Sequence, residues 1–217
     1  MRKPFLLIPL IFLMLSSQLS AESHLLNFGY FYKNRLGEDD GNAYMDAHGF
    51  SLKFINLQGD KHGFYYVLEP YYVAKVIPGD GTSMSFLEPG RIFMGLELLA
   101  GYGGDINLGH SGLIMGGGFM ADTHYLNIPE FTFVDLEFAF GLGGGINYYY
   151  HPKTKHFLIN VGVSLSWKPF TYMSIGDHGT LEEFIFFASQ KSINCTVNFG
   201  FGWRQGNRKK ALYSSEN

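Results

Sequence analysis

The chain has 217 residues, of which 17% are aromatic, 28 are glycine and only 16% are charged, against about a quarter in globular proteins. This composition is typical neither of a soluble helical enzyme nor of a disordered tail. The formal net charge is −3, and it becomes −5 without Arg2 and Lys3, which argues against a nucleic-acid partner because such proteins carry a basic face. The single cysteine, Cys195, allows no disulfide within the chain.

The first 21 residues predict a secretory signal peptide. Arg2 and Lys3 precede an apolar run at residues 5–15, and we expect cleavage after Ala21. The apolar run is shorter than the roughly 20 residues with which a helix crosses a bilayer. The expected organisation is therefore a signal peptide at 1–21, one domain at 22–204 and a polar C-terminal tail at 205–217. An exported chain without disulfides needs another source of stability, and a closed barrel in a membrane is one.

The mature chain predicts strands throughout, with no stretch of 18 consecutive apolar residues that would indicate a transmembrane helix. Pro70 lies inside the third expected strand and predicts a bulge there. The eight expected strands span residues 24–32, 48–57, 63–77, 91–102, 112–122, 131–150, 156–168 and 192–204.

The last three strands alternate most cleanly between an apolar face and a face of small polar residues. In the seventh strand, Val163 and Leu165 alternate with Ser164 and Ser166. A soluble barrel or sandwich would bury the apolar face, but its wet face would usually carry Lys, Glu and Arg. Small uncharged groups suit the lumen of a narrow barrel better, with the apolar face turned to lipid. We therefore favour a membrane barrel and keep the soluble eight-stranded fold as the alternative.

The height of the seventh strand agrees with a membrane. The ten steps from Phe157 to Trp167, at ~3.3 Å each and a ~40° tilt, rise roughly 25 Å, the height of the lipid-facing band of such barrels. Four aromatic residues share the parity of the apolar rows and lie at strand ends, as expected of an aromatic girdle. These residues are Tyr148, Tyr150, Trp167 and Trp203.

The connections alternate in length along the chain. Long loops are expected at 33–47, 78–90 and 169–191, and short turns at 58–63 and 151–155. In outer-membrane barrels the short turns face the periplasm and the longer loops face outward. The link at 103–111 fits this alternation least well.

These features resemble the small eight-stranded bacterial outer-membrane barrels of the OmpA/OmpX/OmpW type, over about residues 22–204 and by pattern rather than by a specific motif. The resemblance implies an all-β fold, an eight-stranded antiparallel up-and-down transmembrane barrel in the bacterial outer membrane. It also implies outer-membrane lipids and the barrel-insertion machinery as partners. Such barrels commonly end in an aromatic residue. Here the aromatic run "NFGFGW" ends at Trp203 and the tail "RQGNRKKALYSSEN" follows.

Several charged residues have the parity of the lumen face. They are interpreted either as an internal salt-bridge network that plugs the barrel or as the lining of a gated conduit for small solutes. The network is favoured because eight strands enclose little more than their own side chains. The predicted lumen charges are Lys53, Glu69, Glu97, Asp135, Glu137, Lys168 and Arg204.

No cofactor or metal site is expected. The glycine runs at 116–118 and 141–145 lie inside strand patterns and lack the setting of a phosphate loop, so we interpret them as space in a crowded lumen. The eight histidines show no zinc-binding spacing. The first loop holds acidic residues that are either simply solvated or bind a divalent cation weakly near lipid headgroups, namely Glu38, Asp39, Asp40 and Asp46.

The last loop holds two further patterns. In "GTLEEFIFFAS" (179–189), Thr180 and Glu183 match a capping box, and three apolar residues follow at helical spacing: Leu181, Phe184 and Ile185. This predicts a short amphipathic helix that acts as a lid, an interface anchor or a patch for a partner or apolar ligand; the alternative is a strand, which would upset the strand count. The same loop holds the residue types of a catalytic triad, Ser174, Asp177 and His178.

The favoured hypothesis is a non-enzymatic integral outer-membrane barrel whose loops 33–47, 78–90 and 169–191 contact an envelope partner, a surface ligand or a host factor. A narrow conduit for small or apolar solutes is the first alternative. A lipid A-modifying enzyme at the outer rim is the second.

Overall fold

The computed structural model describes residues 23–37, 44–59, 61–78, 81–128, 133–152, 157–177, 180–187 and 192–206. The predicted signal peptide and the end of the polar tail therefore lie outside the described residues. The described part is almost entirely strand, and it contains no helix long and apolar enough to cross a membrane. Its strands are β1 (Ser23–Gly37), β2 (Tyr44–Gln58), β3 (His62–Pro78), β4 (Met84–Ser85), β5 (Ile92–Asn107), β6 (Ser111–Ile128), β7 (Phe133–Tyr150), β8 (Phe157–Asp177), β9 (Thr180–Phe187) and β10 (Ser192–Gly206).

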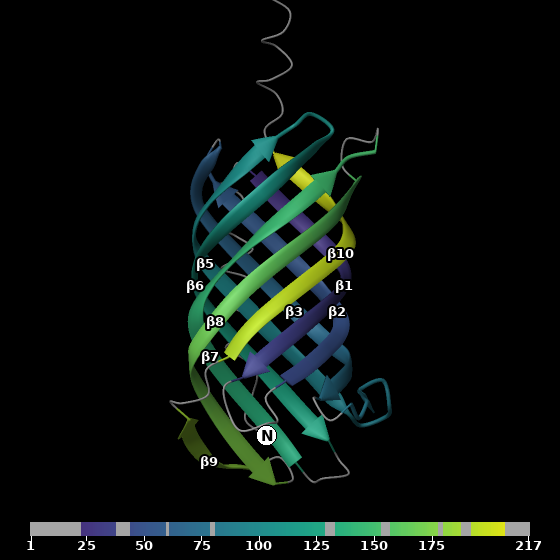
Figure 1. The fold of residues 1–217 in the computed structure, drawn as a ribbon, viewed down its shortest axis with the longest axis vertical. Coiled ribbons are helices and arrows are strands. Elements are labelled where there is room, and N and C mark those ends of the chain that lie inside the picture. Colours follow the sequence, from purple (N-terminus) through teal and green to yellow (C-terminus); the bar gives the residue numbers. More distant parts are fainter. Residues whose placement is uncertain are drawn as a thin grey trace, which may run out of the picture.

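Eight strands form a closed antiparallel barrel (Figure 1). The strands β1, β2, β3, β5, β6, β7, β8 and β10 pair in sequence order, and β10 pairs back with β1 along its whole length, from Gly206 opposite Ser23 to Ser192 opposite Gly37. The short strands β4 and β9 lie off this ring, paired with β3 and β8. The predicted eight-stranded up-and-down barrel is therefore confirmed.

The strands run further than predicted at the long-loop end, the end where β1 meets β2 and β8 leads to β10. β8 continues to Asp177 instead of ending at residue 168, and β6 continues to Ile128 instead of 122. The opposite, short-turn end is tight as expected. Even the link at 103–111 is a three-residue turn with Gly109 at a φ of 86°, a left-handed conformation that glycine adopts without strain.

The predicted helix at 179–189 is wrong, and so is the interpretation of 169–191 as a loop. Residues 180–187 form β9, which pairs with the end of β8 from Thr171 opposite Phe187. The reason lies in the barrel. β10 begins opposite Lys168, so the rest of β8 has backbone groups left to pair, and a hairpin satisfies them. This tertiary demand overrides the local capping pattern.

The bulge predicted at Pro70 is also wrong. The register of β2 and β3 is the same on both sides of it, with Ser51 opposite Tyr71 and Phe54 opposite Leu68. A proline removes one ladder hydrogen bond but inserts no residue. The extra residue of β3 is Ala74, where the register shifts, and a second bulge occurs on β8 between Trp167 and Phe170.

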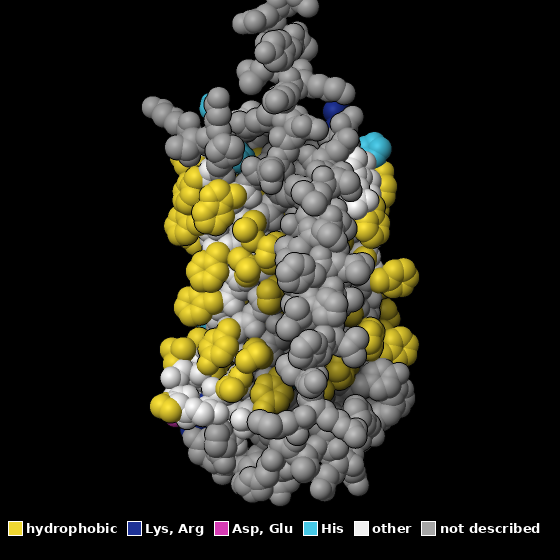
Figure 2. All heavy atoms as spheres, turned by 180° about the vertical axis from the view of Figure 1, so that it is seen from behind, with side chains coloured by type: hydrophobic (Ala, Val, Ile, Leu, Met, Phe, Trp, Pro, Cys, Tyr) yellow, Lys and Arg dark blue, Asp and Glu magenta, His cyan; other side chains and the backbone are white. Residues whose placement is uncertain are grey.

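The apolar rows of the strands face outward, as predicted. On β8, Leu165 is 58% exposed whereas Asn160 is fully buried, and the same alternation follows β10. Figure 2 shows hydrophobic side chains over the described part of the wall, with histidine and charged side chains only toward its two ends. An exposed apolar surface that encircles a protein requires a lipid environment.

The interior differs in part from the expected row of small polar residues. β8 and β10 line it mostly with Asn, Ser and Thr, but large apolar residues also face inward, chiefly from the other strands. These form two clusters, one at each end of the lumen. The short-turn cluster contains Leu25, Ile55, Leu57, Tyr65, Val67, Leu99, Ile114, Met120, Tyr149 and Leu158. The long-loop cluster contains Phe31, Ala47, Val73, Val76, Phe86, Phe93 and Ile128.

Inward-facing glycines make room for the rings of the short-turn cluster. A Cβ atom at Gly116 would lie 2.4 Å from the Tyr65 ring, and one at Gly103 would lie 2.8 Å from the same ring. Gly112 leaves similar space for Tyr149, whose hydroxyl donates a hydrogen bond to Asp105 at 3.0 Å. Of the glycine run at 116–118, Gly116 therefore serves the packing of the lumen.

We expect Gly116→Ala to destabilise the barrel by about 1–3 kcal/mol, because the new methyl group must displace a ring with no space to move into. Gly117→Ala is the matched control, since its Cβ would point outward and lie 3.0 Å from the nearest atom. Urea unfolding in detergent, followed by loss of the compact band on unboiled gels, measures the difference. Equal stability of the two variants would contradict the proposed packing role.

Candidate functional site

A band of buried charges lies between the two apolar clusters. One part of it is a pair on neighbouring strands: Lys53 Nζ of β2 lies 2.9 Å from Glu69 Oε2 of β3. The Ser51 hydroxyl donates to the other oxygen of Glu69 at 2.8 Å. Both charges are buried, so each depends on the other for the solvation that it has lost.

The larger part of the band joins four strands around Asp122 of β6. Lys33 Nζ of β1 lies 3.1 Å from Asp122 Oδ2, and Lys168 Nζ of β8 donates to the same oxygen. Tyr71 of β3 donates to Asp122 Oδ1 at 3.0 Å. Glu97 of β5 completes the group, 3.3 Å from Lys33 and 3.9 Å from Lys168. Two cations and two anions thus brace opposite walls of the barrel.

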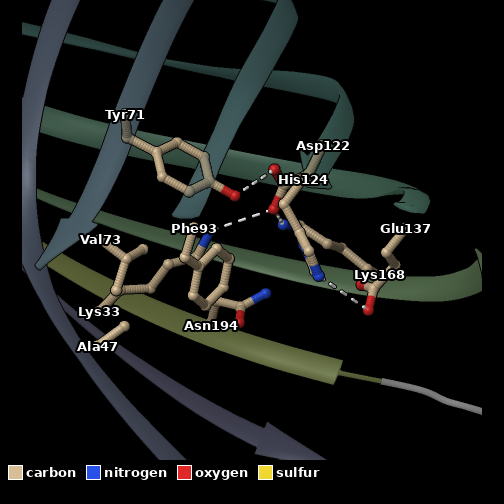
Figure 3. Close-up of a pocket in the computed structure, with 10 residues that line it drawn as sticks. All are labelled: Lys33, Ala47, Tyr71, Val73, Phe93, Asp122, His124, Glu137, Lys168 and Asn194. Carbon is tan, nitrogen blue, oxygen red and sulfur yellow. Dashed lines mark hydrogen bonds and ion pairs between the residues drawn. The ribbon is translucent and has the colours of Figure 1, made fainter. Parts of the chain in front are cut away.

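His124 and Glu137 extend this group toward β7. Their Nε2 and Oε2 atoms are 3.5 Å apart, and the His124 ring packs on Phe93 with centroids 5.2 Å apart. Figure 3 shows these side chains converging from different strands on one small cavity. The cavity measures about 20 Å³, room for roughly one water molecule.

The structure brings together five of the seven predicted lumen charges in ion pairs: Lys53, Glu69, Glu97, Glu137 and Lys168. Asp135 lies on β7 and Arg204 on β10, but their side chains are outside the described part.

Sequence reasoning missed Lys33, Tyr71, Asp122 and His124. The first expected strand stopped at residue 32 and the fifth at 122. The predicted bulge at Pro70 left undetermined which face of the strand Tyr71 occupies. Continuing the alternation by one residue past 32 and by two past 122 would have placed Lys33 and His124 inside.

The predicted girdle residues all face outward. Trp167, Tyr148, Tyr150 and Trp203 are each between 43% and 53% exposed. Other outward aromatic side chains pair with histidines near both ends of the barrel. Tyr30 Oη lies 2.5 Å from His48 Nδ1 at the long-loop end, and Tyr102 Oη lies 2.6 Å from His62 Nδ1 at the short-turn end.

These two tyrosine–histidine pairs lie toward the two ends of the apolar surface. His48 is opposite Lys75 on β3, the strand that begins at His62. Along β3, twelve residue steps of ~3.3 Å at a ~40° tilt separate the levels of the two pairs. The height between them is roughly 30 Å, the thickness of a hydrocarbon core. Amphipathic rings at this spacing are expected at the two membrane–water interfaces.

The remaining candidates from the sequence belong to the first and last expected loops and their flanking strands. Leu181, Phe184 and Ile185 are on β9, and Ser174 and Asp177 on β8, but the structure does not describe these side chains. His178, Glu38, Asp39 and Asp40 are outside the described residues. Asp46 accepts hydrogen bonds from Tyr32 at 2.6 Å and Asn34 at 2.8 Å. Among the described side chains, no group of three or more His, Cys, Asp or Glu could hold a metal ion.

The described residues form a closed ring of eight strands with an outward apolar belt of membrane height and a filled interior. Comparison with solved structures agrees with this fold class. The chain has the fold of the small eight-stranded outer-membrane barrels. OprG from Pseudomonas aeruginosa superposes with a TM-score of 0.50 at 15% identity, over 86% of this chain and 97% of that one. The fold and the apolar belt place the protein in the bacterial outer membrane.

Two other barrels are similar over most of their length. Ail of Yersinia pestis covers 85% of this chain and 99% of its own at 14% identity, with a TM-score of 0.43. Neisserial surface protein A covers 83% and 95% at 10% identity, with a TM-score of 0.44. No protein-family model matches the chain. No curated protein matches it either.

We expect Glu69→Leu to destabilise the barrel by about 3–5 kcal/mol, because it leaves the Lys53 ammonium buried without a counter-ion. The double variant Lys53→Met/Glu69→Leu should recover most of this loss, since no charge is then stranded. Urea unfolding of the two variants against the unchanged barrel measures both effects. A double variant as unstable as the single one would show that the pair itself, and not the stranded charge, determines stability.

Proposed function

We propose that the protein is a non-enzymatic outer-membrane barrel that binds a partner at the cell surface through a sheet projecting from its rim. The observation that carries this proposal is the departure of β8 from the barrel at its long-loop end. There β8 stops pairing with β10 and pairs with β9 instead. Outer-membrane lipids and the barrel-insertion machinery are the other partners that we propose.

The filled lumen favours a role outside the barrel over transport through it. The short-turn cluster and the long-loop cluster close the two ends, and the ion pairs close the middle. Phe86, which follows β4 in the connection between β3 and β5, packs edge-on against Phe93 with ring centroids 5.4 Å apart. A solute would have to displace aromatic rings and break buried ion pairs.

The projecting sheet consists of the ends of β7 and β8 together with β9 (Figure 1). β8 pairs with β7 from Phe133 opposite Asp177, and with β9 on its other edge. Among the described residues, no strand pairs with the far edge of β9. A free edge offers its N–H and C=O groups to an extended segment of another protein, which can add as a further strand.

The sequence of β9 indicates the charge of such a partner. Glu182 and Glu183 are its only charged residues, so the edge carries a net charge of −2. Opposite charges across a strand pair are favourable and like charges are not. We therefore propose that the partner presents an extended segment with lysine or arginine. The long-loop end of such barrels faces away from the cell, which makes this edge accessible to envelope or host proteins.

We expect the purified protein to show no conductance steps in planar bilayers, because the ion pairs and both clusters block the lumen. The conductance of the double variant Tyr65→Ala/Phe93→Ala, which removes one aromatic ring from each cluster, is compared with that of the unchanged protein. Reproducible conductance steps of the unchanged protein, absent from protein-free bilayers, would favour the narrow conduit instead.

We expect replacement of residues 171–187 by a short Gly/Ser turn to leave the barrel folded but to abolish binding of whole cells to immobilised matrix and serum proteins. Consecutive N–H groups of a strand point to opposite edges. A proline has no N–H group, so one of the variants Glu183→Pro and Phe184→Pro removes an N–H group from the free edge of β9. The other removes an N–H group from the edge that pairs with β8.

The same deletion removes Ser174, Asp177 and His178. Unchanged lipid A acyl chains in cells that carry it are expected for a non-enzymatic barrel. An altered acyl pattern that Ser174→Ala reproduces would favour the lipid-modifying enzyme, and retained binding after the deletion would contradict the surface role.

A further inference from the structure

An exposed lysine lies at the long-loop edge of the apolar surface, on the outward face of β3. The cross-strand neighbours of Lys75 are His48 on β2 and Ser85 on β4. Asp46, two residues nearer the rim on β2, accepts hydrogen bonds from side chains of β1. None of the ion pairs between described residues includes Lys75. Its ammonium group is therefore available to an anion outside the barrel.

His48 places a hydrogen-bond donor beside this ammonium group. The Tyr30 hydroxyl lies 2.5 Å from His48 Nδ1, and the Tyr32 ring packs on the imidazole with centroids 5.1 Å apart. A hydroxyl that donates to Nδ1 leaves the proton of the neutral imidazole on Nε2, and we assign this tautomer from the hydrogen bond. Within the described part of the chain, Nε2 has no hydrogen-bond partner, so its N–H group can donate to a ligand.

The connection between β3 and β5 turns back toward the membrane at the same place. β4 pairs antiparallel with the end of β3, and the Phe86 N–H donates to the Ala74 carbonyl at 2.8 Å. Phe86 is therefore one residue nearer the membrane than Lys75, and the next residue, Leu87, is 70% exposed. In Figure 1 this teal connection stands out sideways from the long-loop end of the barrel. It holds an apolar side chain beside the wall, close to the level of the membrane surface.

Hydrogen bonds within this connection fix its shape. Arg91 Nη1 lies 2.7 Å from Glu88 Oε2 and donates to the Ser85 carbonyl at 3.2 Å. The Leu87 N–H donates to the Ser85 hydroxyl at 3.3 Å, and Gly90 has a φ of 87°, in the left-handed region. A side chain that is already held in place loses little conformational entropy when it binds. Leu87 is therefore preorganised for contact with an apolar group.

These features define the chemistry of a ligand. An ammonium group and an imidazole N–H together favour an anion, and a phosphate has acceptor oxygens for both. The exposed leucine beside them suits an acyl chain. The Tyr30–His48 pair lies at one membrane–water interface, and the long-loop end of such barrels faces outward. A molecule with a phosphate at that interface and acyl chains below it is a lipid of the outer leaflet.

We propose that Lys75, His48 and Leu87 form a binding site for a phosphorylated lipid of the outer leaflet, with lipid A as the ligand. Lys75 and the Nε2–H of His48 bind one phosphate of its headgroup. Leu87 packs against one of its acyl chains. The site uses the outward wall and the connection between β3 and β5, and it is separate from the edge of β9, so either this proposal or the surface role can fail without the other.

The opposite end of the barrel supplies a matched control. Tyr102 Oη lies 2.6 Å from His62 Nδ1, and the exposed Lys61 precedes that histidine. The short-turn end faces the periplasmic leaflet, which consists of phospholipids. Lys61→Gln therefore removes the same kind of charge, beside the same kind of tyrosine–histidine pair, without touching the proposed site.

Titration of the detergent-solubilised protein with lipid A, followed by native mass spectrometry, tests the site. Lys75→Gln and Leu87→Ser should each weaken lipid A binding by roughly tenfold. Lys75→Arg should retain most of the affinity, and Lys61→Gln should leave it unchanged. Compact migration of each unboiled variant shows that it has folded. Equal weakening by Lys75→Gln and Lys61→Gln, or unchanged binding by Lys75→Gln, overturns the proposal.

Three further probes identify the group that is bound. Lipid A without its phosphates should bind the unchanged protein roughly tenfold more weakly, and Lys75→Gln should not weaken its binding further. Phosphatidylglycerol that binds as tightly as lipid A overturns the assignment of the ligand. Displacement of lipid A by millimolar inorganic phosphate also overturns it, because the site would then bind free phosphate.

NMR of the unchanged protein with ¹⁵N-labelled histidine provides a second test that needs no variant. His48 should show a neutral imidazole with its proton on Nε2, and saturation with lipid A should shift this signal. His62 is the internal control, and its signal should move less. A His48 signal that lipid A leaves unchanged, or that moves no more than the signal of His62, overturns the proposal.

Discussion

The pairing of β1 with β10 is the interaction on which the whole structure depends. Lipid offers no hydrogen bonds, so each backbone N–H and C=O at membrane depth must find a partner within the protein. An eight-stranded sheet left open would expose two edges to hydrocarbon, and the β1–β10 ladder from Ser23 opposite Gly206 to Gly37 opposite Ser192 removes both. Closure also fixes the alternation of faces, because a sheet that curls into a ring has one lipid side and one enclosed side. The outward Leu165 and the inward Asn160 follow from it.

The small radius of that ring then decides what the interior contains. Eight strands leave space for side chains only, so every large ring turned inward needs a small residue opposite. Gly103 and Gly116 meet this need for Tyr65. The same crowding forces each inward charge to find a counter-ion, as Lys168 does with Asp122 and Lys53 with Glu69. A lumen filled in this way braces the wall from inside.

The rim at the long-loop end is not subject to the constraint of strand closure. Beyond Lys168, β8 no longer pairs with β10 and pairs with β9 instead. Each strand of the closed part pairs with a neighbour on both sides, whereas β9 in the projecting part pairs only with β8 among the described residues. An edge in water is tolerable and available to another chain. Within the described residues, the far edge of β9 thus has N–H and C=O groups that pair with no other strand.

The sequence by itself determined the class of protein, the number of barrel strands and which rows face lipid, because period-2 alternation is a local property that the residues of β7, β8 and β10 display directly. It indicated five of the ion-paired lumen charges for the same reason. The tertiary structure decided where strands end and what meets inside. Lys33 and His124 joined the buried charges because neighbouring strands extended the ladder past the local pattern. Residues 180–187 became a strand because β8 had unpaired backbone to satisfy, although their own spacing favours a helix. Such demands come from neighbours distant in the chain, and no local pattern contains them.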